Sequence, residues 1–95
     1  MTLSRPGLAR DRARRESDRA LAALKERFDT LSSRERDVML HVVAGRLNKQ
    51  IANDIGIAES TVKVHRTNLM RKMKARSLPE LTRMADTLNV RRPQP

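Results

Sequence analysis

A single glycine, Gly56, separates two short stretches of helical character and leaves room only for a tight turn between them. Asn48 is a good capping residue at the start of the first stretch, residues 48–55. After the turn at residues 57–59, Ser60 is expected to cap the second stretch. The pattern predicts the helix-turn-helix arrangement, in which two helices are joined by three or four residues that include a glycine.

Three side chains inside this motif agree with that interpretation. Ala52 is small where the two helices must approach, Gly56 can adopt the positive φ of a turn, and Val62 is apolar where the helices face each other. Any one of these residues alone would carry little information. Together with capping residues on both helices, they form a moderately specific signal.

Two further helices are predicted around the motif. Ser32 and Glu35 form a capping box, so a helix should begin near Ser33, and Gly45 can end it in the left-handed conformation. Its expected buried stripe is Val38, Met39, Val42 and Val43.

A last helix should follow Ser77, with Glu80 completing a second capping box, and run to about Asn89. Its expected apolar face contains Leu78, Leu81, Ala85 and Leu88, with Met84 beside it. Part of this face must close the core, and part could meet a second copy of the chain.

Charge and composition limit the partners of a chain of 95 residues. There are 21 Lys and Arg against 11 Asp and Glu, a net charge of +10, which predicts an anionic partner: nucleic acid first, an acidic membrane surface second. The chain has no cysteine, so no disulfide, zinc site or other cofactor is expected. The longest apolar run, residues 20–24, is far below a membrane span, and no secretory signal is visible, so a cytoplasmic location is expected.

The charge pattern divides the chain. Residues 1–8 contain Pro6 and Gly7 and are expected to be a flexible lead-in. Residues 9–29 favour a charged helix with a weak apolar seam, most simply a solvated linker. The folded domain should cover residues 30–89, and residues 90–95, with two prolines, should be a disordered tail.

A helical wheel of residues 60–74 separates a packed face from a polar one. Val62, Leu69 and Met73 share one face with Arg66. Six Lys and Arg and no acid lie between Ser60 and Pro79, which suits a helix that enters the DNA major groove, although a solvated basic helix would have the same composition. The outward face contains Lys63, Val64, Thr67, Asn68, Arg71 and Lys74.

These motifs resemble a known family. The stretches that carry the resemblance are residues 31–38, Gly45, residues 48–52, residues 57–65 and Met73. They are similar to the LuxR-type helix-turn-helix domain, closest to the DNA-binding half of FixJ/NarL-class two-component response regulators. The resemblance implies an all-α, four-helix LuxR-type domain preceded by a charged linker helix. It also implies a sequence-specific transcriptional regulator whose partner is double-stranded DNA.

The resemblance assigns roles to individual residues. Lys63, Val64 and Thr67 match positions that face bases, although Thr67 is shorter than the usual residue there. Val62, His65 and Leu69 match the packed face. Glu35 is interpreted as a cap and an ion-pair partner of Arg66. Phosphate contacts are expected from Lys49, Ser60, Thr61, Asn68, Arg71 and Lys74.

We also expect a homodimer on an inverted repeat, because one recognition helix covers only about half a turn of the groove and a symmetric pair of domains, which doubles the contacts, requires a palindromic site. The outward side of the last helix is the candidate dimer interface, with Met84, Thr87 and Asn89 as contacts. A receiver domain upstream and RNA polymerase are further possible partners. The chain is either the effector domain of a longer regulator or a stand-alone regulator.

Other functional classes agree less well with the sequence. An enzyme is disfavoured because there is no cysteine nucleophile or glycine-rich phosphate loop, and because Glu35 and Asp37 diverge on their helix. Region 4 of a sigma factor has a similar four-helix layout and remains an alternative. A protein-interaction module that uses the N-terminal helix as a coiled-coil arm, or a membrane-surface helix at residues 9–28, remains weaker.

Overall fold

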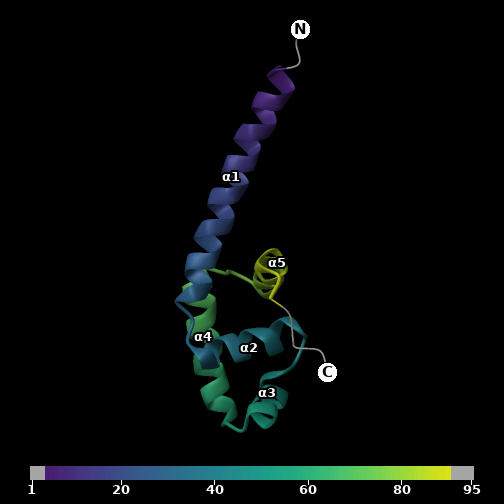
Figure 1. Cartoon of the computed structure of the whole chain (residues 1–95). Helices are drawn as coiled ribbons and strands as arrows, with labels where there is room; N and C mark the ends of the chain where they lie inside the picture. The colour runs from purple at the N-terminus through teal and green to yellow at the C-terminus, as the bar shows by residue number, and fades with distance from the viewer. Residues whose placement is uncertain (1–3, 91–95) are drawn as a thin grey trace.

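The computed structural model describes the backbone of residues 4–90 and the side chains of residues 12–90. In this part of the chain every regular element is a helix, as predicted. A long helix rises from a cluster of four shorter ones, and the molecule measures 64 × 28 × 20 Å (Figure 1). The helices are α1 (Ser4–Asp29), α2 (Ser33–Val43), α3 (Asn48–Ile55), α4 (Glu59–Met73) and α5 (Leu78–Leu88).

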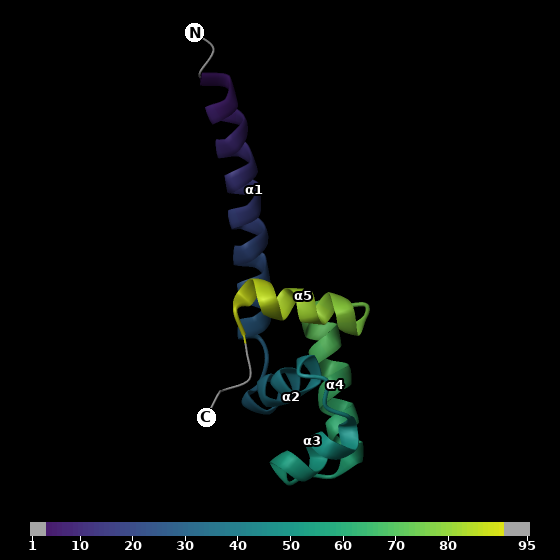
Figure 2. The ribbon, with the colours of Figure 1, turned by 90° about the vertical axis from the view of Figure 1, so that its right-hand side faces the viewer.

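Helix α4 is the centre of the folded cluster. It packs against α2 and α3, and α5 crosses near its C-terminal end (Figure 2). The core contains no aromatic side chain that is fully buried, so it depends on aliphatic and methionine packing. Its largest fully buried side chains are Met39, Ile51, Leu69, Met73, Leu81, Val38, Val42 and Val62.

Both ends of α2 follow the sequence prediction. The Ser32 hydroxyl oxygen accepts a hydrogen bond from the Glu35 amide at 3.1 Å, and the Glu35 carboxylate accepts one from the Ser32 amide at 2.9 Å. This capping box satisfies two amides that the first turn leaves free. Gly45, with φ of 86°, follows the last turn in the left-handed conformation.

The turn between α3 and α4 also forms as predicted, but the two helix starts differ. Gly56 adopts φ of 71° and ends α3. The N-cap of α3 is Leu47 and not Asn48, because the Gln50 side chain accepts the Leu47 amide at 2.9 Å and the chain is already helical at Asn48. The N-cap of α4 is Ala58 and not Ser60, because the Ala58 carbonyl accepts the first amides of that helix.

Helix α5 differs from the prediction in two details. Ser77 caps it through the Glu80 amide at 3.3 Å, but the Glu80 carboxylate accepts from the Arg76 amide instead of completing a capping box with Ser77. Leu81 and Ala85 are buried as expected, whereas Leu78 is exposed and does not serve the core. Within the first turn of α5, Leu81 therefore faces the core and Leu78 faces solvent.

The end of the domain lies one residue later than expected. Asn89 ends α5 with φ of 60°, and the Val90 amide donates to the Ala85 carbonyl at 2.8 Å. Val90 also packs against the core, so it belongs to the domain and not to a tail. Residues 91–95, the rest of the expected tail, lie outside the described residues.

A flexible lead-in was expected at residues 1–8, but helix α1 begins at Ser4, so residues 4–8 are helical; residues 1–3 lie outside the described part. Pro6 falls in the first turn, where its missing amide costs nothing. Residues 12–20 are exposed, and only the C-terminal end of α1 is anchored. There Leu24 is buried, and the Arg36 guanidinium lies 4.6 Å from the centre of the Phe28 ring.

Candidate nucleic-acid interface

One face of α4 is fixed by the core. Val62, Leu69 and Met73 have no exposed surface, so the rotation of the helix about its axis is determined by packing. His65 and Arg66 are half-buried at the edges of this face. The polar side chains of the opposite face are therefore held toward solvent by the same contacts that stabilise the domain.

The residues expected to face bases lie together on this outward face. Lys63 and Thr67 are exposed, and Val64 keeps 58% of its surface exposed. Together with Asn68 they line a shallow surface pocket. An exposed valine beside a lysine and a threonine offers a methyl group for thymine and a donor for guanine.

Hydrogen bonds along α4 orient two of these side chains. The Thr67 hydroxyl donates to the Lys63 carbonyl at 3.0 Å, which leaves its oxygen lone pairs and its methyl group available outward. Half-buried Asn68 accepts from the Arg71 guanidinium at 3.5 Å, a long contact that directs Arg71 along the helix surface. Of the six residues expected to contact phosphates, Asn68 is thus the least accessible.

The other five expected phosphate contacts are exposed around the outward face. Lys49 lies in the first turn of α3, and Ser60 and Thr61 lie in the first turn of α4. Arg71 and Lys74 lie at the opposite end of α4, where Lys74 ends the helix with φ of 57°. Lysine and arginine side chains therefore flank the base-facing residues at both ends, an arrangement that can span a groove between two phosphate strands.

A contact between α3 and α4 was not predicted from the sequence. The Arg66 guanidinium donates to the Asn48 side-chain oxygen at 3.0 Å, and both residues line a pocket with Lys63, Thr67 and Met70. This hydrogen bond fixes the first turn of α3, with Lys49, against the middle of α4. The wheel had placed Arg66 on the packed face, but its partner could only be found in three dimensions.

The predicted ion pair between Glu35 and Arg66 is wrong. Glu35 is buried, and its carboxylate accepts from Lys72 Nζ at 2.8 Å. Lys72 also donates to the Thr30 carbonyl at 3.3 Å, so it joins α4 to the end of α1 as well as to α2. The spacing of Lys72, three residues after buried Leu69, was the available sequence signal for a position at the edge of the core.

Burial, hydrogen bonds and the charge of Lys72 act on the pKa of Glu35 in opposite directions. Burial alone would raise the pKa of its carboxyl group, but hydrogen bonds from Lys72 and from the Ser32 amide, together with the positive charge of Lys72, outweigh burial. The net effect holds the pKa of Glu35 below its ordinary value. Glu35 is therefore a structural anion at neutral pH.

Residues 29–85 match the family described as "Bacterial regulatory proteins, luxR family" (GerE). The chain belongs to this luxR family. The match begins at the end of α1 and covers α2, α3, α4 and most of α5, so the family assignment includes the whole candidate interface. The luxR-family domain is a DNA-binding transcription regulator and not an enzyme, which also decides against region 4 of a sigma factor.

Curated relatives agree with this assignment. The luxR-family chain is 53% identical over 81 residues to "Nodulation protein W" of Bradyrhizobium diazoefficiens, an alignment that covers 85% of this chain and 36% of the relative. It is 58% identical over 62 residues to "Transcriptional regulatory protein FixJ" of Rhizobium meliloti, with 65% and 30% covered. The chain thus spans about a third of the length of these relatives.

Solved structures share the fold. The response regulator StyR, solved at low resolution, is 41% identical with a TM-score of 0.80, and the match covers 85% of this chain and 41% of StyR. Full-length FixJ from B. japonicum is 40% identical with a TM-score of 0.70, with 78% and 36% covered. These matches confirm the all-α, LuxR-type fold predicted from the sequence.

Neither a membrane span nor a metal centre is found in the described part of the chain. Within residues 4–90, every helix is too short or too polar to cross a membrane. Among the side chains described for residues 12–90, acidic and histidine groups do not gather into a cluster that could hold a metal ion.

Proposed function

We propose that this luxR-family chain is the DNA-binding effector part of a response regulator and that α4 enters the major groove. The main support is that α4 has one buried side and one exposed side. Val62 and Leu69 are fully buried, whereas Lys63, Val64 and Thr67 project into solvent. Lys63 donates to guanine acceptors, Val64 contacts a thymine methyl group, and Thr67 makes a shorter polar contact.

Phosphates hold the domain in register. Lys49, Ser60 and Thr61 contact one strand, and Asn68, Arg71 and Lys74 contact the other side of the groove. The exposure of all but Asn68 supports this assignment. Three of the six are cations, so these contacts contribute about −2.7 to the slope of log affinity against log salt for each bound copy.

Two copies bind an inverted repeat through α5. Met84 and Thr87 lie about 60° apart on α5 and form a narrow strip, with Thr87 exposed and Met84 half-buried against the core; exposed Asn89, which ends the helix, lies about 160° around the helix from Thr87. Such a strip falls well below the ~1,200 Å² of a stable interface, and the dimer forms mainly on DNA. Met84 contributes only its outer edge, and Thr87 is the more accessible contact.

The full regulator carries a receiver domain ahead of α1 and acts on RNA polymerase in the cytoplasm. Two relatives, one named a response regulator and one a transcriptional regulatory protein, support this organisation, because this chain matches only about a third of their length. Phosphorylation of such a receiver would act through α1, which is anchored to α4 at Thr30.

Selection from a random duplex library with the 95-residue chain tests the proposal. We expect an enriched site with two similar halves in opposite orientation, and a footprint that covers both halves. Titration with salt should weaken binding steeply. Failure to enrich any sequence over the starting library, or affinity independent of salt, would contradict the DNA-reading role of α4.

A further inference from the structure

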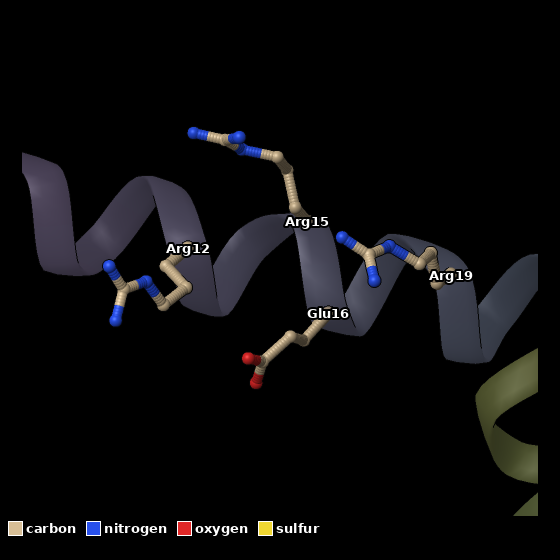
Figure 3. A pocket seen from close by; sticks show the side chains of 4 residues that line it. All are labelled: Arg12, Arg15, Glu16 and Arg19. Atoms are coloured by element: carbon tan, nitrogen blue, oxygen red, sulfur yellow. The ribbon is translucent and has the colours of Figure 1, made fainter.

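Helix α1 lies almost entirely outside the residues matched to the luxR family, yet it carries a dense group of arginines. Arg12, Arg15 and Arg19 project from consecutive turns of the helix and line a surface pocket with Glu16 (Figure 3). All four side chains are exposed. Among the side chains described for residues 12–90, none of the ion pairs within 4.0 Å involves these three arginines or Glu16.

This group belongs to a longer face of α1. At about 100° per residue, Arg12, Arg15, Glu16 and Arg19 fall within about 120° of Ala23, Glu26 and Arg27. Leu24 and Phe28, which anchor α1 to the core, lie outside this sector, about 60° and 100° beyond Arg27. The arginine face, defined as Arg12, Arg15, Arg19 and Arg27, therefore runs along one side of α1, with Arg12, Arg15 and Arg19 exposed and Arg27 half-buried at the anchored end of the helix.

The arginine face is continuous with the candidate DNA surface. Ala23, Glu26 and Arg27 line a second pocket together with Thr30, Lys72 and Lys74. Lys74 is the last basic residue of the outward face of α4, and Lys72 holds the Thr30 carbonyl at 3.3 Å. One basic strip therefore runs from the end of α4 onto α1.

We infer that the arginine face binds the phosphate backbone of the DNA that flanks the site contacted by α4. Four guanidinium groups against Glu16 and Glu26 give this face an excess of positive charge, and arginine suits phosphate oxygens particularly well. From Arg12 to Arg27 the helix rises about 22 Å, a length comparable to about six base pairs. These contacts extend the footprint and the affinity without adding base recognition.

This inference rests on the proposed function, since it needs α4 on DNA, but its test separates the two. The variant is Arg15→Gln with Arg19→Gln, and the matched control is Arg14→Gln with Lys25→Gln, which removes the same charge from another side of α1. Glutamine has a helix propensity similar to that of arginine and lysine. Circular dichroism verifies that the helix content of each variant is unchanged. Each protein is the 95-residue chain and is titrated with two duplexes that carry the selected site.

The short duplex ends at the site, and the long duplex extends roughly one helical turn beyond it on each side. On the long duplex, the arginine-face variant should lose affinity and its salt slope should fall by about 1.8 per copy. On the short duplex it should match the wild type, as should the control on both. Hydroxyl-radical footprinting should show lost protection in the flanks and unchanged protection at the centre.

Equal losses in the variant and the control, or equal losses on the short and long duplexes, overturn the inference and leave the proposed function intact. A wild-type chain that binds neither duplex overturns the proposed function, and this inference with it.

Discussion

Lys72 Nζ lies 2.8 Å from Glu35 Oε1 and connects the C-terminal part of α4 to the capping box of α2. Glu35 keeps only 5% of its surface exposed, and its carboxylate also accepts a hydrogen bond from the Ser32 amide. One carboxylate thus satisfies a helix end and an ion pair at the same time. Lys72 also donates a hydrogen bond to the Thr30 carbonyl, directly after α1. The Lys72 side chain therefore connects α4 to both α2 and the end of α1.

Glu35→Gln should destabilise the domain at neutral pH by about 1.5–3 kcal/mol, the usual contribution of a hydrogen bond to a charged group. The pKa of Glu35 is lowered in the folded state, so its stabilising effect is complete above the unfolded pKa of about 4.3 and is lost as the pH falls through the folded pKa. Urea unfolding measured at neutral pH and at several acidic pH values checks this.

In that experiment the difference in unfolding free energy between wild type and Glu35→Gln should shrink in acid. Glu59→Gln serves as the control, because Glu59 is an exposed carboxylate in the first turn of α4. A constant difference between wild type and Glu35→Gln across the whole acidic range would contradict the lowered pKa of Glu35.

The turn glycine provides a second prediction. Gly56→Val should lower the unfolding free energy by about 1–3 kcal/mol, because a β-branched residue is strained at φ of 71°. A Cβ at this position would meet no atom within 4 Å, so the cost comes from the backbone alone. Gly56→Asn, which tolerates the left-handed conformation, should lose clearly less in thermal melting. Equal melting temperatures for the two variants would contradict a purely conformational cost.

The features that the sequence predicted correctly are local ones. The capping residues Ser32 and Ser77 determine where α2 and α5 begin, and Gly56 determines where the chain turns, because these features depend on neighbours in sequence. The buried side of α4 was also predictable, since Val62 and Leu69 repeat at helical spacing. The outward positions of Lys63, Val64 and Thr67 follow from that periodicity.

The errors concern competition between local and tertiary contacts. Asn48 was expected to cap α3, but its side chain accepts from Arg66 of α4 and the cap moves to Leu47. Glu35 was expected to pair with Arg66, but Lys72 takes that place. Both partners are more than fifteen residues away along the chain, so only the packing of α4 decides between them.

A third prediction distinguishes residues that recognise bases from residues that bind phosphates. Lys63→Ala should lose about 1–3 kcal/mol of discrimination at particular base pairs, because Lys63 is proposed to donate to a base edge. Lys49→Ala should weaken all sequences about equally and reduce the salt slope by about 0.9 per copy. Affinities for a set of single-base variants of the selected site measure both effects. Identical specificity profiles for the two variants would contradict the proposed docking.

The last prediction concerns the proposed dimer. Met84→Asp is a poor probe because Met84 packs partly against the core, and the substitution would also cost folding energy. Thr87 is exposed and uses only its hydroxyl, which donates to the Arg83 carbonyl at 2.9 Å. Thr87→Arg places two like charges across a symmetric interface while the fold stays intact.

We expect Thr87→Arg to bind a single half-site like the wild type and to lose cooperativity on the full inverted repeat. Thr82→Arg, at a position that faces another side of α5, supplies the charge-matched control and should bind both DNAs with cooperativity unchanged. Band-shift titrations give the cooperativity, and mass measurements in solution and on DNA give the stoichiometry. If the wild-type chain binds the full repeat strictly one-to-one, the dimer is wrong. If Thr87→Arg keeps full cooperativity, the dimer uses a surface other than this strip of α5.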